Sequence, residues 1–305
     1  MITRDGKIAQ QPLPSFETPG LSKIDNWKIK LLKEGFERTG GSTTLGEDAY
    51  SIAKLRNSTG LCVTVADGVG GWNDSGVDPS VFSTALCYYA QQSARNRTAQ
   101  SQPEGDVLQA EPRRILEDAY LAVLTEPTVQ AGSSTALNAC LAASTGILDC
   151  ANLGDSGFAI LRDSKAIHVQ PSQTKYFNCP WQLAKIPIDM GDNVSDVPQD
   201  AQLFSTQLRH DDLVVLYTDG FSDNVFVREL EALVAAVSKA CKGQMSEEDF
   251  VQTLANQLVR YARACSFSQT KESPFELEAR RHGNADLTGG KIDDITVVAL
   301  LAGEM

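Results

Sequence analysis

The chain has 305 residues, of which 42% are apolar and 22% charged, and its formal net charge is −12. This composition is typical of a globular protein with a substantial core. The negative charge repels phosphate backbones and anionic lipids, so nucleic acids and membranes are poor candidates for partners. No apolar run approaches the roughly 20 residues that a membrane helix needs, and we expect no membrane insertion.

The seven cysteines include no CxxC pair, and Cys62, Cys87 and Cys140 each lie within an apolar run. A free cysteine in such a run behaves as a small hydrophobic residue. We therefore predict buried, reduced thiols rather than disulfides or zinc ligands, and a reducing compartment.

Residues 1–40 are expected to form a flexible N-terminal segment with a short helix at 21–36, where Ile24, Trp27 and Leu31 recur at helical spacing. The first twenty residues lack the Arg- and Ser-rich character of an organelle presequence. Residues 41–305 show no internal repeat and no domain boundary, so a single domain is predicted there.

Alternating and apolar runs predict the next elements. Strands are expected at 49–56 and 61–68, helices at 79–95 and 112–125, and a polar linker at 96–111. Proline at position 79 favours a helix start at that residue. Short β runs between 133 and 170 then indicate an antiparallel meander, followed by a long irregular insertion at 171–200.

The remaining patterns predict strands at 201–209 and 212–218, helices at 227–241 and 246–265, a loop at 266–291 and a last strand at 291–302. Groups of strands that alternate with groups of helices are typical of an α+β fold. We expect sheets packed together with helices outside them.

Carboxylates stand beside glycine or at strand ends in GEDA (46–49), ADGVGG (66–71), NLGDSG (152–157), YTDGFSDN (217–224) and KIDDIT (291–296). Each motif alone could be a turn or a helix cap, because Asp-Gly is a common turn dipeptide. Together they suggest a shared site, since hard divalent cations prefer oxygen ligands and crowded carboxylates repel each other without a cation. The sequence therefore predicts a Mg²⁺ or Mn²⁺ site.

In this order, these motifs resemble those of the metal-dependent serine/threonine protein phosphatases of the 2C type. The resemblance runs from about Gly46 to Leu301. The longer strings VADGVGGW, GVDPS, YFNCPWQL and GGKIDDIT look like a small subgroup associated with mitochondria in fungi and animals. The resemblance implies a four-layer α-β-β-α sandwich, in which helix pairs flank two central antiparallel sheets, with the metal site at one edge.

The resemblance also implies roles for individual residues. Asp67 would bridge two Mg²⁺ or Mn²⁺ ions, and Asp67, Asp219 and Asp293 would be the catalytic core. The implied metal ligands are Glu47, Asp48, Asp67, the Gly68 carbonyl, Asp155, Asp219 and Asp293, with Asp155 and Asp219 forming a weaker third site. Asp294 stands where many members have Asn. A water between two metals has a lowered pKa and attacks phosphorus in line.

Two departures from the family pattern affect the expected rate. Val69 replaces a histidine that acts as a general acid in many members, and the stretch GGSTTL (40–45) lacks the arginine that grips phosphate. A metal-bound water is the candidate acid, and Lys54, Arg56 and Lys291 are the candidate phosphate contacts. We therefore expect modest turnover.

Other chemistry-bearing residues have simpler interpretations. We expect structural or surface roles for the three histidines, His168, His210 and His282. Trp72 is expected to pack. For Tyr176, Phe177 and Trp181, packing and substrate recognition remain equally open.

The leading hypothesis is hydrolysis of phosphoserine and phosphothreonine in proteins by a monomeric enzyme. An inactive relative that serves as a regulatory binding module is the alternative, and a phosphoesterase for a small molecule is a third hypothesis. The resemblance implies a location in the mitochondrial matrix, with the cytoplasm as the alternative.

Overall fold

The computed structural model describes residues 22–39, 46–98, 111–187, 195–241 and 243–303. The lead-in at 1–20, the stretch GGSTTL and most of the predicted linker lie outside these residues. The helices are α1 (Lys23–Thr39), α2 (Pro79–Arg95), α3 (Pro112–Thr125), α4 (Asp219–Ser222), α5 (Val227–Cys241), α6 (Glu247–Ser266) and α7 (Pro274–Arg281).

The strands form two main antiparallel sheets. They are β1 (Asp48–Lys54), β2 (Gly60–Asp67), β3 (Gly132–Ser134), β4 (Ala136–Ala142), β5 (Ile147–Leu153), β6 (Gly157–Arg162), β7 (Lys165–Val169), β8 (Thr174–Tyr176), β9 (Cys179–Pro180), β10 (Leu183–Lys185), β11 (Gln202–Gln207), β12 (Leu213–Tyr217) and β13 (Val297–Leu301). One sheet has the order β1-β2-β4-β5-β11 and the other β13-β12-β6-β7. The pairs β3–β10 and β8–β9 form two small additional sheets.

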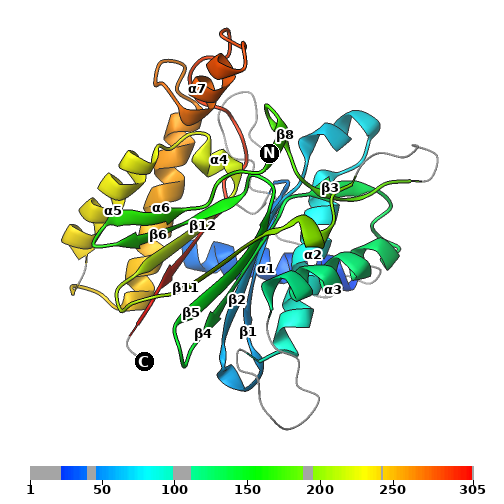
Figure 1. Cartoon of the computed structure of the whole chain (residues 1–305), viewed down its shortest axis with the longest axis horizontal. Helices are drawn as coiled ribbons and strands as arrows, with labels where there is room; N and C mark the ends of the chain where they lie inside the picture. The colour runs from blue at the N-terminus through cyan, green and yellow to red at the C-terminus, as the bar shows by residue number, and fades with distance from the viewer. Residues whose placement is uncertain (1–21, 40–45, 99–110, 188–194, 242, 304–305) are drawn as a thin grey trace.

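Alternation along the strands distributes apolar side chains between separate clusters. Val63 and Val65 of β2 share a buried cluster with Phe158 of β6 and Val214 and Leu216 of β12, so the two sheets contact each other through it. A second cluster joins the five-stranded sheet to α2 and α3. A third joins the four-stranded sheet to α5 and α6. Figure 1 shows these two helix pairs on opposite sides of the strands.

Helix α1 packs against α2, as Trp27 shows. Its indole nitrogen donates a hydrogen bond of 3.0 Å to Gln91, and its ring meets that of Tyr88 edge to face at 5.7 Å. Lys28 donates to the Ser80 hydroxyl at 2.9 Å. The predicted helix in this segment is confirmed, as is the helix that begins at Pro79, where the side chain of Asp78 caps the Ser80 amide.

Four predictions about the elements need correction. The meander is divided, since β4 and β5 belong to one sheet and β6 and β7 to the other. The insertion at 171–200 is not wholly irregular, because it contains β8, β9 and β10. The loop at 266–291 contains α7. The last strand begins only at Val297, so Asp293 and Asp294 lie in the loop before it.

All seven cysteines are free thiols that form no disulfide. Cys62, Cys87 and Cys140 are buried, which confirms the prediction of buried thiols. Within the described ranges, none of the helices combines the length and apolar character needed to cross a membrane.

Candidate metal centre

The ends of the two main sheets bring the predicted carboxylates together. In the five-stranded sheet, Asp48 at the start of β1 pairs in register with Asp67 at the end of β2. In the four-stranded sheet, β12 leads directly into Thr218 and Asp219, and its last residue pairs with the first residue of β13, which follows the loop of Asp293. Neighbouring antiparallel strands therefore place acidic residues close together at one end of each sheet, where the strands begin or end.

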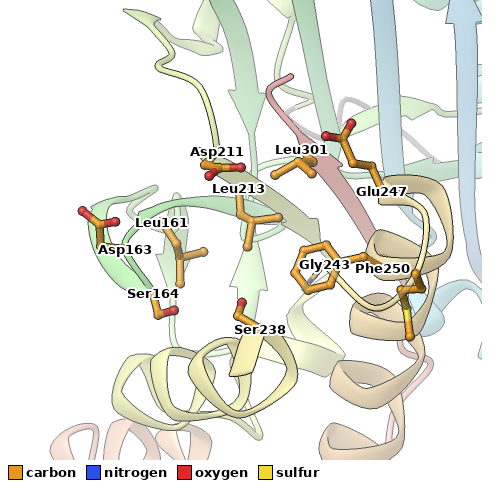
Figure 2. Close-up of a pocket in the computed structure, with 11 residues that line it drawn as sticks. Leu161, Asp163, Ser164, Asp211, Leu213, Ser238, Gly243, Glu247, Phe250 and Leu301 are labelled. Atoms are coloured by element: carbon orange, nitrogen blue, oxygen red, sulfur yellow. The ribbon is translucent and has the colours of Figure 1, made fainter. Parts of the chain in front are cut away.

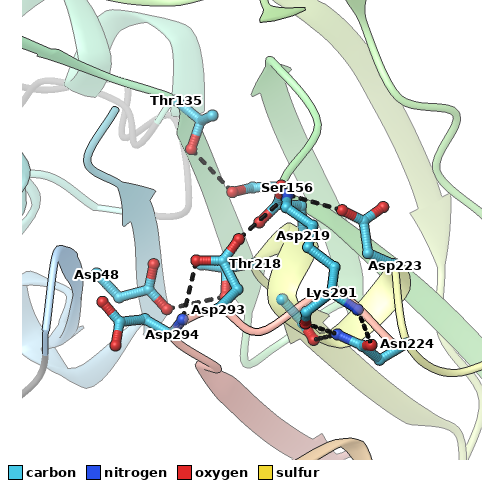
Figure 3. Close-up of polar contacts among 11 residues, drawn as sticks. Asp48, Thr135, Ser156, Thr218, Asp219, Asp223, Asn224, Lys291, Asp293 and Asp294 are labelled. Carbon is cyan, nitrogen blue, oxygen red and sulfur yellow. Dashed lines mark hydrogen bonds and ion pairs between the residues drawn. The ribbon is translucent and has the colours of Figure 1, made fainter. Parts of the chain in front are cut away.

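Hydrogen bonds link these ends of the two sheets to each other. The Thr218 hydroxyl donates to Asp48 Oδ2 at 2.9 Å (Figure 3). The same hydroxyl accepts the Thr296 amide at 3.0 Å. The Glu47 amide donates to Asp294 Oδ2 at 2.7 Å. These contacts fix the carboxylates of one sheet relative to those of the other.

Burial and repulsion between neighbouring carboxylates both raise the pKa values of Asp48 and Asp67. Burial raises the pKa of Asp48 well above its usual range; hydrogen bonds from Thr296 and Thr218 oppose this, whereas repulsion from Asp294 and Asp219 adds to it. Burial also raises the pKa of Asp67, with further increases from Asp48 and Asp219. A nearby divalent cation would favour the ionised form of each group.

Gly68 is packed closely between the backbone of Glu47 and the backbone of Pro79. A Cβ at this position would stand 2.7 Å from the carbonyl oxygens of both Glu47 and Pro79, so only glycine fits without a backbone shift. The Gly68 amide donates to the Glu47 carbonyl at 3.1 Å. The Glu47 side chain accepts from Asn73 at 2.7 Å, which directs it toward the loop that follows Asp67.

A lysine stands among the remaining acids. The Lys291 ammonium lies 2.5 Å from Asp219, 2.8 Å from Asp223 and 3.1 Å from Asp293 (Figure 3). Burial lowers the pKa of Lys291, but these carboxylates more than offset it and raise the pKa overall. Burial, together with repulsion from Asp219, raises the pKa of Asp223 to about 7 even though Lys291 opposes the shift.

Asp155 belongs to the same group of acids. Burial, together with repulsion from Asp219 and Asp223, raises its pKa well above the usual range. The adjacent Ser156 hydroxyl is 2.8 Å from that of Thr135, which accepts the Asp67 amide at 3.0 Å. The loop after β5 is therefore connected to the end of β2.

The donor set fits a hard divalent cation. Asp48 Oδ1, Asp155 Oδ1 and Asp219 Oδ1 are buried and have no hydrogen-bond partner among the described residues. A buried carboxylate oxygen without a partner is costly, and Mg²⁺ or Mn²⁺ would satisfy it. In the same ranges, no group of three Asp, Glu, His or Cys side chains is already arranged around one point as metal ligands.

The candidate phosphate contacts lie in two different places. Lys291 is inside the cluster. Lys54 ends the strand that Asp48 begins, and Arg56 follows it. Six residue steps along a strand span about 20 Å, so the structure does not bring Lys54 and Arg56 together with the carboxylates.

Three residues of the centre have no predicted role from the sequence: Thr218, Asp223 and Asn224. Asp223 follows Asp219 by four residues, a spacing that places two side chains on the same face of a helical turn. This spacing could have identified it. The contacts of Thr218 with Asp48 and Thr296, and those of Asn224 with Lys291, depend on chain segments far away in sequence.

The aromatic residues of the insertion differ in their surroundings. Phe177 packs against Phe275 and His282, with ring centroids 5.3 Å and 5.5 Å away. Trp181 packs, half-buried, against the core, whereas Tyr176 is 68% exposed.

His168 and Trp72, for which we expected structural roles, both contact neighbouring side chains of the fold. His168 stacks on Phe204 at 4.0 Å, and burial lowers its pKa. Trp72 donates to the Ser133 hydroxyl at 2.6 Å.

A pocket of about 620 Å³ lies elsewhere (Figure 2). Its lining includes Leu213 and Leu301, which pair at the end of β12 and β13 opposite to Asp219 and Asp293. None of the predicted site residues lines it.

Known proteins are similar to this chain in sequence and in fold. The profile of the family described as "Protein phosphatase 2C" matches residues 41–260. The 5-azacytidine resistance protein azr1 of Schizosaccharomyces pombe is 35% identical over 84% of this chain and 81% of its own length. Protein phosphatase 2C homolog 7, mitochondrial, of Saccharomyces cerevisiae is 32% identical over 84% of this chain and 74% of its own length.

A solved structure agrees with these relatives. The photosystem II phosphatase PBCP superposes with a TM-score of 0.66 at 28% identity, over 88% of this chain and 94% of its own. The family profile covers well over half of the chain. This chain therefore belongs to the protein phosphatase 2C family.

Proposed function

We propose that this chain hydrolyses phosphoserine and phosphothreonine in proteins, using Mg²⁺ or Mn²⁺ held at the junction of its two main sheets. The observation that carries the proposal is the convergence of Asp48, Asp67, Asp219 and Asp293 from both sheets, with oxygens of Asp48 and Asp219 buried and unpartnered. Membership of the family supports the same activity.

The proposed ligands are those predicted from the sequence, with Asp67, the Gly68 carbonyl, Asp219 and Asp293 nearest to the reaction. Two divalent cations would supply a water of lowered pKa and would neutralise the phosphoryl oxygens. The protein's own part is to hold the carboxylates in place. Thr218 orients Asp48 through a 2.9 Å hydrogen bond. The close packing of Gly68 against the backbone of Glu47 and Pro79 holds the loop after Asp67 in place.

The leaving alkoxide needs a proton, and Val69 cannot supply one. Its amide donates to the Ser133 carbonyl at 3.1 Å, which fixes the backbone of the loop but adds no acid. The prediction of modest turnover therefore stands as part of the proposal.

The finer architecture is also proposed. Three apolar clusters, one between the sheets and one beneath each helix pair, support a four-layer α-β-β-α sandwich. Residues 41–305 are proposed to be a single catalytic domain, with α1 packed against α2. We propose that it acts as a monomer on phosphorylated proteins, and that it works in mitochondria, as the name of the Saccharomyces cerevisiae relative suggests.

The test compares hydrolysis of a phosphopeptide and of a small phosphoester with Mn²⁺ and with EDTA. Asp67→Asn should abolish Mn²⁺-dependent hydrolysis of the phosphopeptide. Asp74→Asn is the matched control, because Asp74 is exposed in the loop that follows Asp67.

Each hypothesis predicts a different result. Activity that survives EDTA or Asp67→Asn would refute the mechanism. No activity on either substrate would favour a regulatory binding module. Activity on the small phosphoester alone would favour the small-molecule phosphoesterase.

A further inference from the structure

Thr135 forms hydrogen bonds with both backbone groups of Asp67. The Asp67 amide donates to Thr135 Oγ1 at 3.0 Å, and the Thr135 amide donates to the Asp67 carbonyl at 3.0 Å. Thr135 is 1% exposed and lies between β3 and β4. Neither bond uses the carboxylate oxygens of Asp67, so a cation that binds those oxygens does not compete with Thr135.

The bond from the Asp67 amide replaces a bond of the sheet. The pairing of β2 with β4 reaches Val65 opposite Leu137, and two more residues along each strand bring Asp67 opposite Thr135. In a regular antiparallel ladder, two facing residues exchange both of their N–H···O=C bonds. Here the Thr135 carbonyl accepts the Ser134 hydroxyl at 2.7 Å, and the Asp67 amide donates to the Thr135 hydroxyl. A side chain therefore fixes the backbone of Asp67 at the end of β2.

A second buried hydroxyl holds the first in place. Ser156 Oγ lies 2.8 Å from Thr135 Oγ1 (Figure 3). Ser156 is buried in the connection from β5 to β6, which belong to different main sheets. A hydroxyl has one hydrogen and two lone pairs, so Thr135 Oγ1 can bind Ser156 while it accepts the Asp67 amide.

Packing also restricts the Thr135 side chain. A Cβ built on Gly154 would stand 2.8 Å from Thr135 Cγ2, so the methyl group lies close to the Gly154 backbone. The branched Cβ of threonine limits rotation of the side chain. The position of the methyl group therefore directs the hydroxyl toward Asp67 and Ser156.

We propose that Thr135 is a positioning residue for the reaction: its hydroxyl sets the direction in which Asp67 presents its carboxylate, and Ser156 orients that hydroxyl. The inference rests on the proposed function, because it takes Asp67 as a ligand of the divalent cations. Thr135 acts through Asp67 and contacts neither the cations nor the substrate. Outer partners of metal ligands commonly contribute about 10-fold to 100-fold to metal affinity or activity.

The test replaces the hydroxyl with a methyl group of similar size, in Thr135→Val. In EDTA, the Asp67 amide should exchange its hydrogen about 10-fold faster, which nuclear magnetic resonance measures without any metal present. The affinity for Mn²⁺, measured by isothermal titration calorimetry, should fall about 10-fold to 100-fold. At saturating Mn²⁺, kcat for a phosphopeptide should fall while KM stays the same. Thr135→Ser keeps the hydroxyl and should restore the exchange rate and the affinity.

Ser156→Ala tests the role of the second hydroxyl. It should weaken Mn²⁺ binding less than Thr135→Val does, because the Asp67 amide keeps its acceptor. The double variant should bind Mn²⁺ as Thr135→Val does, since Ser156 acts only through Thr135. Additive losses in the double variant would overturn the role given to Ser156.

Thr64→Val is the matched control. Thr64 is a buried residue of β2 whose hydroxyl donates to Asn138 at 3.1 Å. It precedes Asp67 by three residues, so the two side chains lie on opposite faces of the strand. The same substitution at Thr64 also removes a buried hydrogen bond, and it should leave the Mn²⁺ affinity unchanged.

Native Mn²⁺ affinity and native Asp67 exchange in a folded Thr135→Val variant would overturn the inference and leave the proposed function intact. An equal loss of affinity in Thr64→Val would do the same, because it would reduce the effect to a general loss of stability. No bound Mn²⁺ in a native protein that is also inactive would overturn both. If circular dichroism shows that Thr135→Val is unfolded, Ser156→Ala decides, and native Mn²⁺ affinity in that variant overturns the inference.

Discussion

Gly220 provides a sharp test of how the metal centre is assembled. It is the second residue of α4, directly after Asp219, and it faces the loop before β13. A Cβ built on Gly220 would stand 1.9 Å from the Asp294 carbonyl oxygen and 3.2 Å from the Asp293 Cβ. The perturbation that we consider is Gly220→Ala.

The magnitude follows from that distance. Since Cβ atoms essentially never come within 3.0 Å of another heavy atom, the loop must retreat by about 1 Å. Overpacking of this kind costs about 1–3 kcal/mol, whereas alanine in a helix gains about 1 kcal/mol over glycine. We therefore expect a small loss of stability. A displacement of about 1 Å at a catalytic group can reduce the rate about 100-fold.

The assay is Mn²⁺-dependent phosphopeptide hydrolysis, accompanied by thermal unfolding. Gly71→Ala is the control, because a Cβ at Gly71 would meet nothing within 4 Å and that residue also lies in a loop next to the centre. If Gly220→Ala hydrolyses the peptide as fast as Gly71→Ala, the loop does not hold Asp293 in the way the structure indicates.

Three further predictions concern stability. Asn224→Ala leaves buried backbone groups without partners and should lower the free energy of unfolding by about 2–4 kcal/mol; urea unfolding checks this, and a change below 1 kcal/mol contradicts it. Asp212→Asn weakens the two-bond pair with Arg162, at 2.8 and 2.7 Å, and should lower the melting temperature. Because this pair lies far from Asp219 along β12, the Mn²⁺ dependence of hydrolysis should not change, and a changed Mn²⁺ requirement would argue against that separation. A hydrogen bond from Tyr89 is the main cause that lowers the pKa of Glu126 from 4.5 to about 2, so its stabilisation is complete above pH 4.5 and is lost as the pH falls toward 2. Glu126→Gln should therefore show a flatter decline of melting temperature over that range, and identical curves would refute this.

The strands, the main helices and the acidic motifs could be predicted because they depend on local patterns. Asp67 and Asp219 were expected at strand ends. Asp67 does end β2, whereas Asp219 follows β12 after Thr218 and is the first residue of α4. Helix α7 also had a local signal, since the Ser273 hydroxyl accepts the Glu276 amide at 3.1 Å in an S-x-x-E pattern. The pattern lies in a polar stretch that suggested only a loop.

The rest depended on contacts between distant segments. The loop before β13 is not a strand, because Asp293 accepts the Asp294 amide and Asp294 accepts the Glu47 amide. Such side-chain bonds to the backbone compete with the ladder of a sheet. The inward direction of Lys291 likewise follows from Asn224, whose three bonds no periodicity in the sequence reveals.

The links between the two sheets also bear on how the chain reaches its active state. The bond from Thr218 to Asp48 joins residues 170 positions apart, and that from Glu47 to Asp294 joins residues 247 apart. Contacts at such separations form late, after the closure of long loops. A ribosome-bound chain that has not yet emerged as far as Asp293 has only part of the proposed ligand set. With the proposed ligands, cation binding would be complete only in the finished fold, and through mass action free Mg²⁺ or Mn²⁺ would stabilise that fold over every partly folded one.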